Sequence, residues 1–541
     1  MSRRRTIEVL LCLVVALAIG LTAPSATPSQ RVDPGDRFSA VPLHPQAVEK
    51  LKAAGRKLPS PFPNSANRGR KFNPTGDAIG PLVTARVQNV LVIFVKFSDD
   101  PPGGPATRLD LATYFDAMLF GTEYDPPEYA PYVGHPIDRT LRNYYSEVSY
   151  GGVDVVTLDM PSELGWAEME QAYDYYCDGQ YGFGWYPRNA AALVEDAVKA
   201  VDAVVDFRNY AVNGEVPNLF VVHAGTGAEW NGDPSLLWSH SWDLEYGAAG
   251  KFISNEGVVI NNYALMPEVG GNTTGYYGGP TGPYPPTVGV FAHEYAHVLG
   301  LPDQYDYGNE SNGTGPYSLM SYGSWNQWPV DDIFSGNSPA HLDAWSKYRL
   351  GFVTPVEIAS ATSGVLLPAE TDPVVYKMVV PFSGGKEYFL FENRQNIGFD
   401  EGLLLYGGGY AHGLAIYHID DGVLTRNYWR PNEAENWKEF RSEGWRKAWT
   451  GETHYGISIM QADGWWTLER GGWGNFASDL YPGYLGVTKF GNDTHPNSSN
   501  YYFWAGSAPK FGYSGVTVDK IQESGGIVSA DFSFVPWTPK K

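Results

Sequence analysis

A five-residue segment near the middle of the chain, residues 293–297 (HEYAH), constrains the fold more than any other feature. Its two histidines are four residues apart, so on an α-helix they share a face and both imidazoles can bind one metal ion. Glu294 between them can act as general base on a metal-bound water. Gly300 and Asp303 follow, which predicts a turn that brings in Asp303 as the third ligand.

The residues around this segment have the spacing of an amphipathic helix. At ~100° per residue, the apolar residues fall on one side, with His293 and His297 on the opposite side. Thr287 is placed as the N-cap, and Gly300 stands where a helix end favours a left-handed residue. The apolar face consists of Val288, Phe291, Ala292, Tyr295, Val298 and Leu299. The pattern predicts a helix along the floor of a cleft.

Zinc suits two imidazoles, a carboxylate and one open position for water. The predicted ligands are His293, His297 and Asp303, with Asp306 the nearest competitor for the third place. In the predicted reaction Glu294 takes a proton from the metal-activated water, which attacks a peptide carbonyl. Glu294 then returns the proton to the leaving amine.

The N-terminus is typical of a secretory signal over residues 1–26. Three arginines precede a short apolar run at residues 9–21, and small residues follow at 23–26. The apolar run is too short to span a bilayer. The predicted localisation is therefore secreted and extracellular, with no membrane association once the signal is cleaved.

Charge and cysteine content limit the partners and crosslinks. The formal net charge of −22 argues against nucleic acid and anionic membrane surfaces as partners. Of the two cysteines, Cys12 leaves with the signal, so the mature chain cannot form an internal disulfide. Cys177 is expected to be a small buried residue.

The 541 residues are expected to form several parts. Residues 27–85 read as a pro-segment or a flexible lead-in. Strand-like runs alternate with helical patterns over residues 86–352, which predicts an α/β catalytic domain. Short strand-like runs separated by turns follow, so residues 353–541 are predicted to be an all-β, β-sandwich-like region.

Downstream of the histidine helix, residues 317–325 (YSLMSYGSW) resemble the methionine turn of the metzincin peptidases. Met320 matches the turn methionine. Tyr322 matches the tyrosine that stabilises the transition-state oxyanion in some branches. Most metzincins have histidine as the third ligand, whereas this chain has Asp303.

A closer resemblance is to the immune inhibitor A family of secreted metallopeptidases, which share the Gly-Leu-Pro-Asp continuation of the zinc motif. The resemblance extends over segments such as 141–155 (LRNYYSEVSYGGVDV), 289–306 (GVFAHEYAHVLGLPDQYD) and 387–400 (EYFLFENRQNIGFD). It implies a metzincin-like zincin fold, secretion, an N-terminal pro-segment and structural Ca²⁺. Gly76-Asp77 resembles the aspartate that caps zinc in some zymogens, although a plain turn is the simpler interpretation.

The first hypothesis is a secreted zinc metalloendopeptidase, made as a zymogen and acting as a monomer on protein or peptide substrates. The second is a catalytically retired scaffold that serves as a surface or polysaccharide-binding adhesin. The complete set of His293, Glu294, His297 and Asp303 favours the enzyme, because a retired one would be expected to have lost a member.

Overall fold

The computed structural model describes residues 38–59, 86–99, 108–130, 134–270, 285–328, 335–404, 411–434, 455–501 and 512–535. Residues 33–541 form one compact unit. The predicted signal peptide and the Gly76-Asp77 turn lie outside the described residues. Among the described residues, no helix is both long and apolar enough to cross a membrane.

A six-stranded sheet organises the part of the chain that carries the histidine motif. Its strand order is β1-β8-β11-β7-β3-β5. Strands β5, β3, β7 and β11 run parallel, whereas β8 is antiparallel to β11 and β1 is antiparallel to β8. The strands are β1 (Ser39–Ala40), β3 (Leu91–Lys96), β5 (Trp166–Glu168), β7 (Leu219–Thr226), β8 (His240–Asp243) and β11 (Asn262–Val269).

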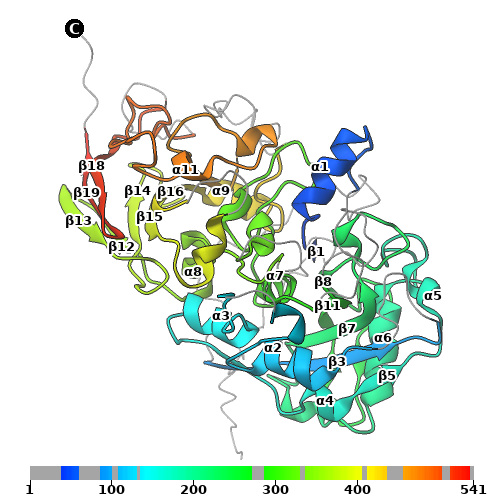
Figure 1. The fold of residues 1–541 in the computed structure, drawn as a ribbon. Helices are drawn as coiled ribbons and strands as arrows, with labels where there is room; N and C mark the ends of the chain where they lie inside the picture. Colours follow the sequence, from blue (N-terminus) through cyan, green and yellow to red (C-terminus); the bar gives the residue numbers. More distant parts are fainter. Residues whose placement is uncertain are drawn as a thin grey trace, which may run out of the picture. The chain divides into compact units, whose positions relative to one another are not determined.

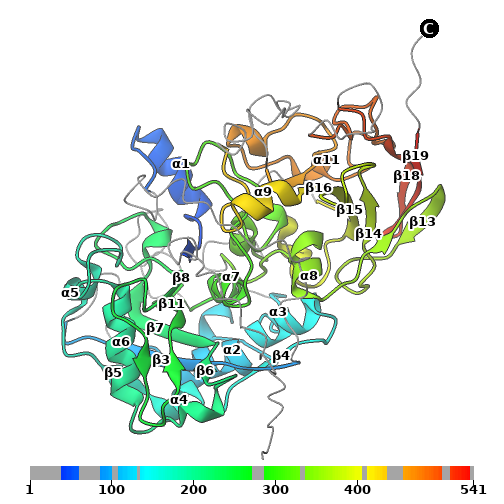
Figure 2. The same cartoon turned by 180° about the vertical axis from the view of Figure 1, so that it is seen from behind.

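Helices cover both faces of this sheet (Figures 1 and 2). Successive strand side chains point to opposite faces, so an apolar run such as β3 serves two cores. Ile93 packs in the core that contains helix α6 (Ala190–Val201), whereas Phe94 packs in the core that contains helices α3 (Leu141–Val148) and α7 (Val288–Val298). The mixed α/β architecture predicted from the sequence is therefore present.

The helix ends follow local sequence signals. The Thr140 side chain accepts a hydrogen bond from the Asn143 N–H at the start of α3, and the Asn189 side chain accepts one from the Ala192 N–H at the start of α6. Such caps satisfy amide groups that have no partner inside the helix. The other α-helices are α1 (Pro45–Ala53), α2 (Ala117–Phe120), α4 (Pro161–Leu164), α5 (Tyr173–Cys177), α8 (Ala344–Leu350), α9 (Asp421–Arg426) and α11 (Phe476–Asp479).

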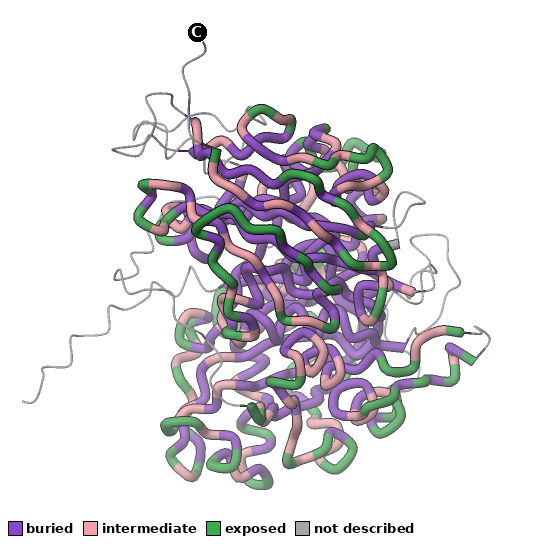
Figure 3. The backbone as a smooth tube through the Cα atoms, turned by 90° about the vertical axis from the view of Figure 1, so that its left-hand side faces the viewer, coloured by how far each residue is buried: buried purple, intermediate pink, exposed green. Residues whose placement is uncertain are grey.

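The C-terminal part contains two sheets that share one core. The first has the order β12-β14-β15-β16-β17 and the second the order β13-β19-β18. Side chains such as Phe391 of the first sheet and Phe532 of the second meet in this core, with ring centroids 5.3 Å apart. In Figure 3 the sheet with β13 lies toward the viewer. Along β13, Gly364 and Leu366 are buried and the other three residues are exposed. The β-sandwich stays a prediction.

The bounds of these strands and of the remaining short ones are as follows. They are β2 (Val87–Asn89), β4 (Asp154–Val156), β6 (Glu215–Val216), β9 (Phe252–Ile253), β10 (Val259–Ile260), β12 (Val356–Glu357), β13 (Thr362–Leu366), β14 (Tyr376–Val379), β15 (Glu387–Arg394), β16 (Gly413–Asp420), β17 (Ile457–Ile459), β18 (Val516–Ser524) and β19 (Ile527–Phe534).

The sheet of β15 and β16 also packs against the part of the chain that carries the histidine motif. Leu390 and Ile419 on its second face belong to the same hydrophobic core as Phe291 of α7 and Trp345 of α8. The apolar core is thus continuous across residue 352, the predicted domain boundary.

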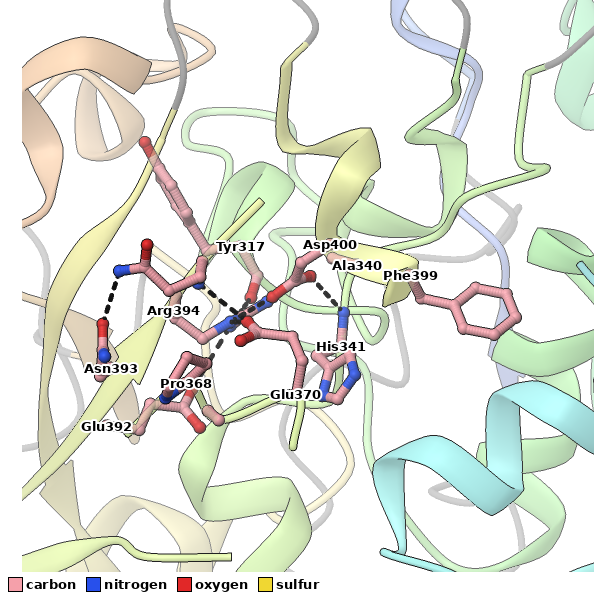
Figure 4. A network of polar contacts seen from close by, with 12 residues as sticks. Tyr317, Ala340, His341, Pro368, Glu370, Glu392, Asn393, Arg394, Phe399 and Asp400 are labelled. Carbon is pink, nitrogen blue, oxygen red and sulfur yellow. Dashed lines mark hydrogen bonds and ion pairs between the residues drawn. The ribbon is translucent and has the colours of Figure 1, made fainter. Parts of the chain in front are cut away.

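A buried ion network joins the two parts at Arg394 (Figure 4). Its guanidinium donates two hydrogen bonds to Asp400, at 2.6 and 2.8 Å, and a third to the Tyr317 carbonyl at 2.8 Å. Glu392 lies 3.3 Å away. Because the Arg394 and Asp400 side chains are fully buried, the network fixes β15 against the loop that leads to Met320.

We expect Arg394→Leu to lower the free energy of unfolding by about 3–5 kcal/mol, because it leaves buried carboxylates without their cation. Urea unfolding of the two proteins measures the difference. Arg208→Leu is the matched control, since Arg208 makes the same two-point contact with Asp206 but in solvent. Equal stability losses in the two variants would contradict this role of Arg394.

Cys177 is a free, buried thiol, as its isolation in the sequence predicted. Burial raises the pKa of this thiol to about 12, so it remains protonated at physiological pH. It is therefore inert as a nucleophile.

Candidate metal centre

Helix α7 presents its apolar side to the central sheet and its histidines to the opposite side. Phe291 and Tyr295 pack in the core beneath the sheet, and the Tyr145 hydroxyl donates to the Ala292 carbonyl at 2.7 Å. Thr287 occupies the N-cap position, as predicted, but its hydroxyl donates to the Ser335 carbonyl instead of capping the helix.

Gly300 turns the chain at the end of α7. Its φ of +100° lies in the region that favours glycine. The Gly300 N–H donates to the His297 carbonyl at 2.8 Å, and the Leu301 N–H donates to the Ala296 carbonyl at 3.0 Å. This closed turn brings Asp303 back to the histidines, as the spacing predicted.

His293, His297 and Asp303 converge on one point. The two Nε2 atoms are 3.0 Å apart, and Asp303 Oδ1 lies 3.1 Å from His293 Nε2 and 3.2 Å from His297 Nε2. Tetrahedral zinc ligands at ~2.1 Å from the metal are about 3.4 Å from one another. The three atoms therefore have nearly the separations that one small cation requires, and within the described residues they form a group able to hold a metal.

The protonation of the imidazoles supports a cation at this point. His293 Nδ1 contacts the Leu319 carbonyl and His297 Nδ1 contacts the Leu301 carbonyl, both at 2.8 Å. A carbonyl only accepts, so each Nδ1 carries the proton and each neutral Nε2 points a lone pair inward. Two lone pairs that face a carboxylate are stabilised by a positive charge between them.

Burial and charge favour the metal-binding protonation states. Burial lowers the pKa of His293 despite its contact with Asp303, which keeps the ring neutral. Burial alone would raise the pKa of Asp303, but positive charge at the position of the two imidazole Nε2 atoms outweighs burial and holds that pKa well below its usual range. Asp303 Oδ2 in addition accepts a hydrogen bond from the Tyr307 hydroxyl, which orients the carboxylate.

Glu294 faces the same side of the helix end. Its side chain is fully buried, and burial together with the charge of Asp303 raises its pKa well above the usual range. Oε1 accepts a hydrogen bond from the Val41 N–H at 2.9 Å. Oε2 has no hydrogen-bond partner among the described residues.

Sequence comparison identifies the family that shares this arrangement. The model of the family "Immune inhibitor A peptidase M6, catalytic domain" matches residues 82–352, half of the chain, and this range contains the complete cluster. The chain belongs to this family.

Two curated proteins illustrate the similarity. Immune inhibitor A of Bacillus thuringiensis subsp. alesti is 31% identical over 270 residues, which cover 44% of this chain and 37% of that protein. The Pre-pro-metalloprotease PrtV of Vibrio cholerae serotype O1 is 26% identical over 302 residues, 49% of this chain and 30% of that protein. The chain thus spans less than two fifths of the length of these relatives.

Three other residues singled out from the sequence, Met320, Tyr322 and Asp306, lie outside the cluster of candidate metal ligands. Met320 is buried beside the site, and its carbonyl accepts from the Gln304 N–H at 2.7 Å. The Tyr322 ring packs edge-on against Trp473 at 4.9 Å. Asp306 accepts hydrogen bonds from the Ser311 hydroxyl and amide rather than joining the cluster.

Glu268 of β11 is fully buried and makes a structural contact. Its carboxylate accepts hydrogen bonds from the Arg108 side chain at 2.7 Å and from the Leu109 and Gly225 amides at 2.7 and 3.0 Å. His240 is buried and hydrogen-bonded to Trp238 and Tyr263, as expected for a structural histidine.

Two contacts of the site were missed from the sequence. Tyr307 follows Asp303 by four residues and binds its carboxylate. Val41 comes from the N-terminal segment, and its amide reaches Glu294 across 253 positions of sequence. The motif spacing carried a weak signal for Tyr307 and none for Val41.

Proposed function

We propose that this protein is a zinc-dependent endopeptidase that hydrolyses peptide bonds of extracellular proteins. The supporting observation is the convergence of His293 Nε2, His297 Nε2 and Asp303 Oδ1 beside a buried Glu294, inside the region matched to a peptidase family. Zinc fits this donor set because it prefers nitrogen and carboxylate ligands at tetrahedral separations.

A zinc ion held by these three residues would supply Lewis-acid chemistry, polarising the peptide carbonyl and making a water molecule acidic. The chain's own residues then carry out the proton transfers. Beside a cation Glu294 ionises, accepts a proton from the water and delivers it to the leaving nitrogen. The Leu319 and Leu301 carbonyls hold the rings in the tautomer that leaves Nε2 free. Tyr322 remains the sequence-based candidate for the oxyanion donor.

The protein is further proposed to be secreted as a zymogen and to act as a monomer. The position of residues 38–53 supports the proposal of a zymogen. The Val41 amide donates a hydrogen bond to Glu294, and α1 packs its Val48 and Leu51 side chains into the main core. A metzincin-like catalytic fold, a C-terminal β-sandwich and structural calcium in the acidic loops belong to the same proposal.

The adhesin alternative is not favoured. A binding scaffold has no need of a general base, yet Glu294 is present and lies beside the candidate metal ligands. A second, binding role for the C-terminal part would be compatible with catalysis.

We expect zinc chelation to abolish hydrolysis of a quenched-fluorescence peptide by the proteolytically activated protein, and stoichiometric Zn²⁺ to restore it. The physical reason is that the carbonyl is no longer polarised and no acidic water remains. Peptide hydrolysis and metal analysis on one sample measure the effect. Mg²⁺ serves as the control ion, because it disfavours imidazole ligands. Activity that survives complete removal of the metal would contradict the proposed function.

A further inference from the structure

An N-terminal segment lies along the free edge of the central sheet, next to the metal centre. Strand β1 pairs antiparallel with β8, with Ser39 opposite Ser241 and Ala40 opposite His240. In Figure 1 the blue β1 and α1 accordingly lie close to β8. Peptides are commonly bound in this way, as an added strand at a sheet edge. The segment thus has the conformation that an extended substrate would have.

Three successive carbonyl groups of this segment each accept a hydrogen bond from an aromatic side chain. The Tyr305 hydroxyl donates to the Ala40 carbonyl. The Trp238 indole donates to the Val41 carbonyl at 2.8 Å, and the Trp325 indole donates to the Pro42 carbonyl at 2.9 Å. These contacts recognise backbone rather than side chains, so they would serve any extended polypeptide.

The Ala40–Val41 peptide bond contacts Glu294 through its N–H and Tyr305 through its carbonyl oxygen. Its N–H donates to Glu294 Oε1 at 2.9 Å and also faces the Ser239 carbonyl at 3.3 Å. Its carbonyl oxygen accepts from Tyr305. In peptide hydrolysis the leaving nitrogen must receive a proton from the general base, and the carbonyl oxygen must be stabilised as it gains negative charge. In the structure the nitrogen lies within hydrogen-bond distance of Glu294, to which its N–H donates, and the Tyr305 hydroxyl donates to the carbonyl oxygen.

We propose that Tyr305 is a catalytic residue, whose hydroxyl donates a hydrogen bond to the carbonyl oxygen of the scissile peptide, and that residues 39–42 hold the place of the substrate. This inference rests on the proposed peptidase function. It assigns to Tyr305 the role that the metzincin resemblance gives to Tyr322. The two rings are neighbours, with centroids 5.9 Å apart, but the contact with the Ala40 carbonyl comes from Tyr305.

The test uses the full-length chain with Val48→Asp, which weakens the packing of α1 and is expected to open the groove. In this background, Tyr305→Phe should lower kcat about 10²–10³-fold, as for loss of one oxyanion donor, with KM changed less than about threefold. A phosphinic peptide mimics the tetrahedral transition state, including its charged oxygen. Because Tyr305→Phe removes a hydrogen bond to that oxygen, the Kd of the phosphinic peptide, measured by calorimetry, should rise by a similar factor. Metal content and melting temperature should stay unchanged.

Matched variants separate catalysis from binding. Trp325→Phe removes the indole N–H that donates to the Pro42 carbonyl, away from the scissile bond. It should raise KM by about 2–10-fold, the value of one hydrogen bond, and leave kcat unchanged. Tyr305→His, which keeps a donor, should recover part of kcat if Tyr305→Phe proves unstable.

Two results would overturn the inference: kcat within about threefold of the parent for Tyr305→Phe, or the kcat loss appearing in Tyr322→Phe instead. No hydrolysis by the parent chain with Tyr305 intact would count against the peptidase function itself.

Discussion

Glu294→Gln is expected to lower kcat by about 10²–10⁴-fold, the range for removing a general acid–base catalyst. The amide keeps the shape of the side chain and can still contact the Val41 backbone, but it cannot take a proton from water or return one to the leaving nitrogen. Steady-state hydrolysis of a quenched-fluorescence peptide by the activated protein measures the loss.

The metal ligands are untouched by this change, so the zinc content should equal that of the parent protein. Glu168→Gln is the control, because Glu168 is an exposed carboxylate on strand β5 of the central sheet. Activity within tenfold of the parent, at full zinc occupancy, would mean that another group serves as the base.

Asp303→Ala should weaken zinc binding by more than about 100-fold, because loss of an outer contact alone costs 10–100-fold. The change removes the only carboxylate of the cluster and leaves its two imidazoles. Activity should fall in step with occupancy at limiting zinc. Competition with a chromophoric chelator measures the affinity.

Asp306→Ala is the matched control, since both aspartates stand in the same loop and Asp306 was the competing ligand. Asp306 accepts bonds from Ser311, so its removal is expected to lower the melting temperature while leaving zinc affinity within a few-fold of the parent. The assignment of Asp303 fails if Asp306→Ala shows the larger loss of zinc affinity.

Local features of the site were predictable because their causes are local. The period of apolar residues gives the helix at residues 288–298, and a glycine at position 300 suits the left-handed turn that the structure contains. Ligands four residues apart on one helix, followed by such a turn, need no distant contact to be recognised.

Contacts that depend on tertiary packing could not be predicted from the sequence. Asp303 and Asp306 have the same side chain and are three residues apart. Only the path of the loop places Asp303 in the cluster and Asp306 against Ser311. Glu268 is held by a hydrogen bond from Arg108, which is 160 positions away in the sequence. The contact of Val41 with Glu294 depends on strand pairing between distant segments, which periodicity does not encode.

The continuity of the hydrophobic core across residue 352 bears on how this protein unfolds. Leu390 and Ile419 share a core with Phe291 and Trp345, so the histidine helix and the C-terminal sheet are expected to lose their structure in one cooperative transition. A chain cut at residue 352 would expose the apolar surface of α8 to water. The end of the family match at residue 352 is therefore expected to be a limit of sequence similarity and not the edge of a piece that folds alone.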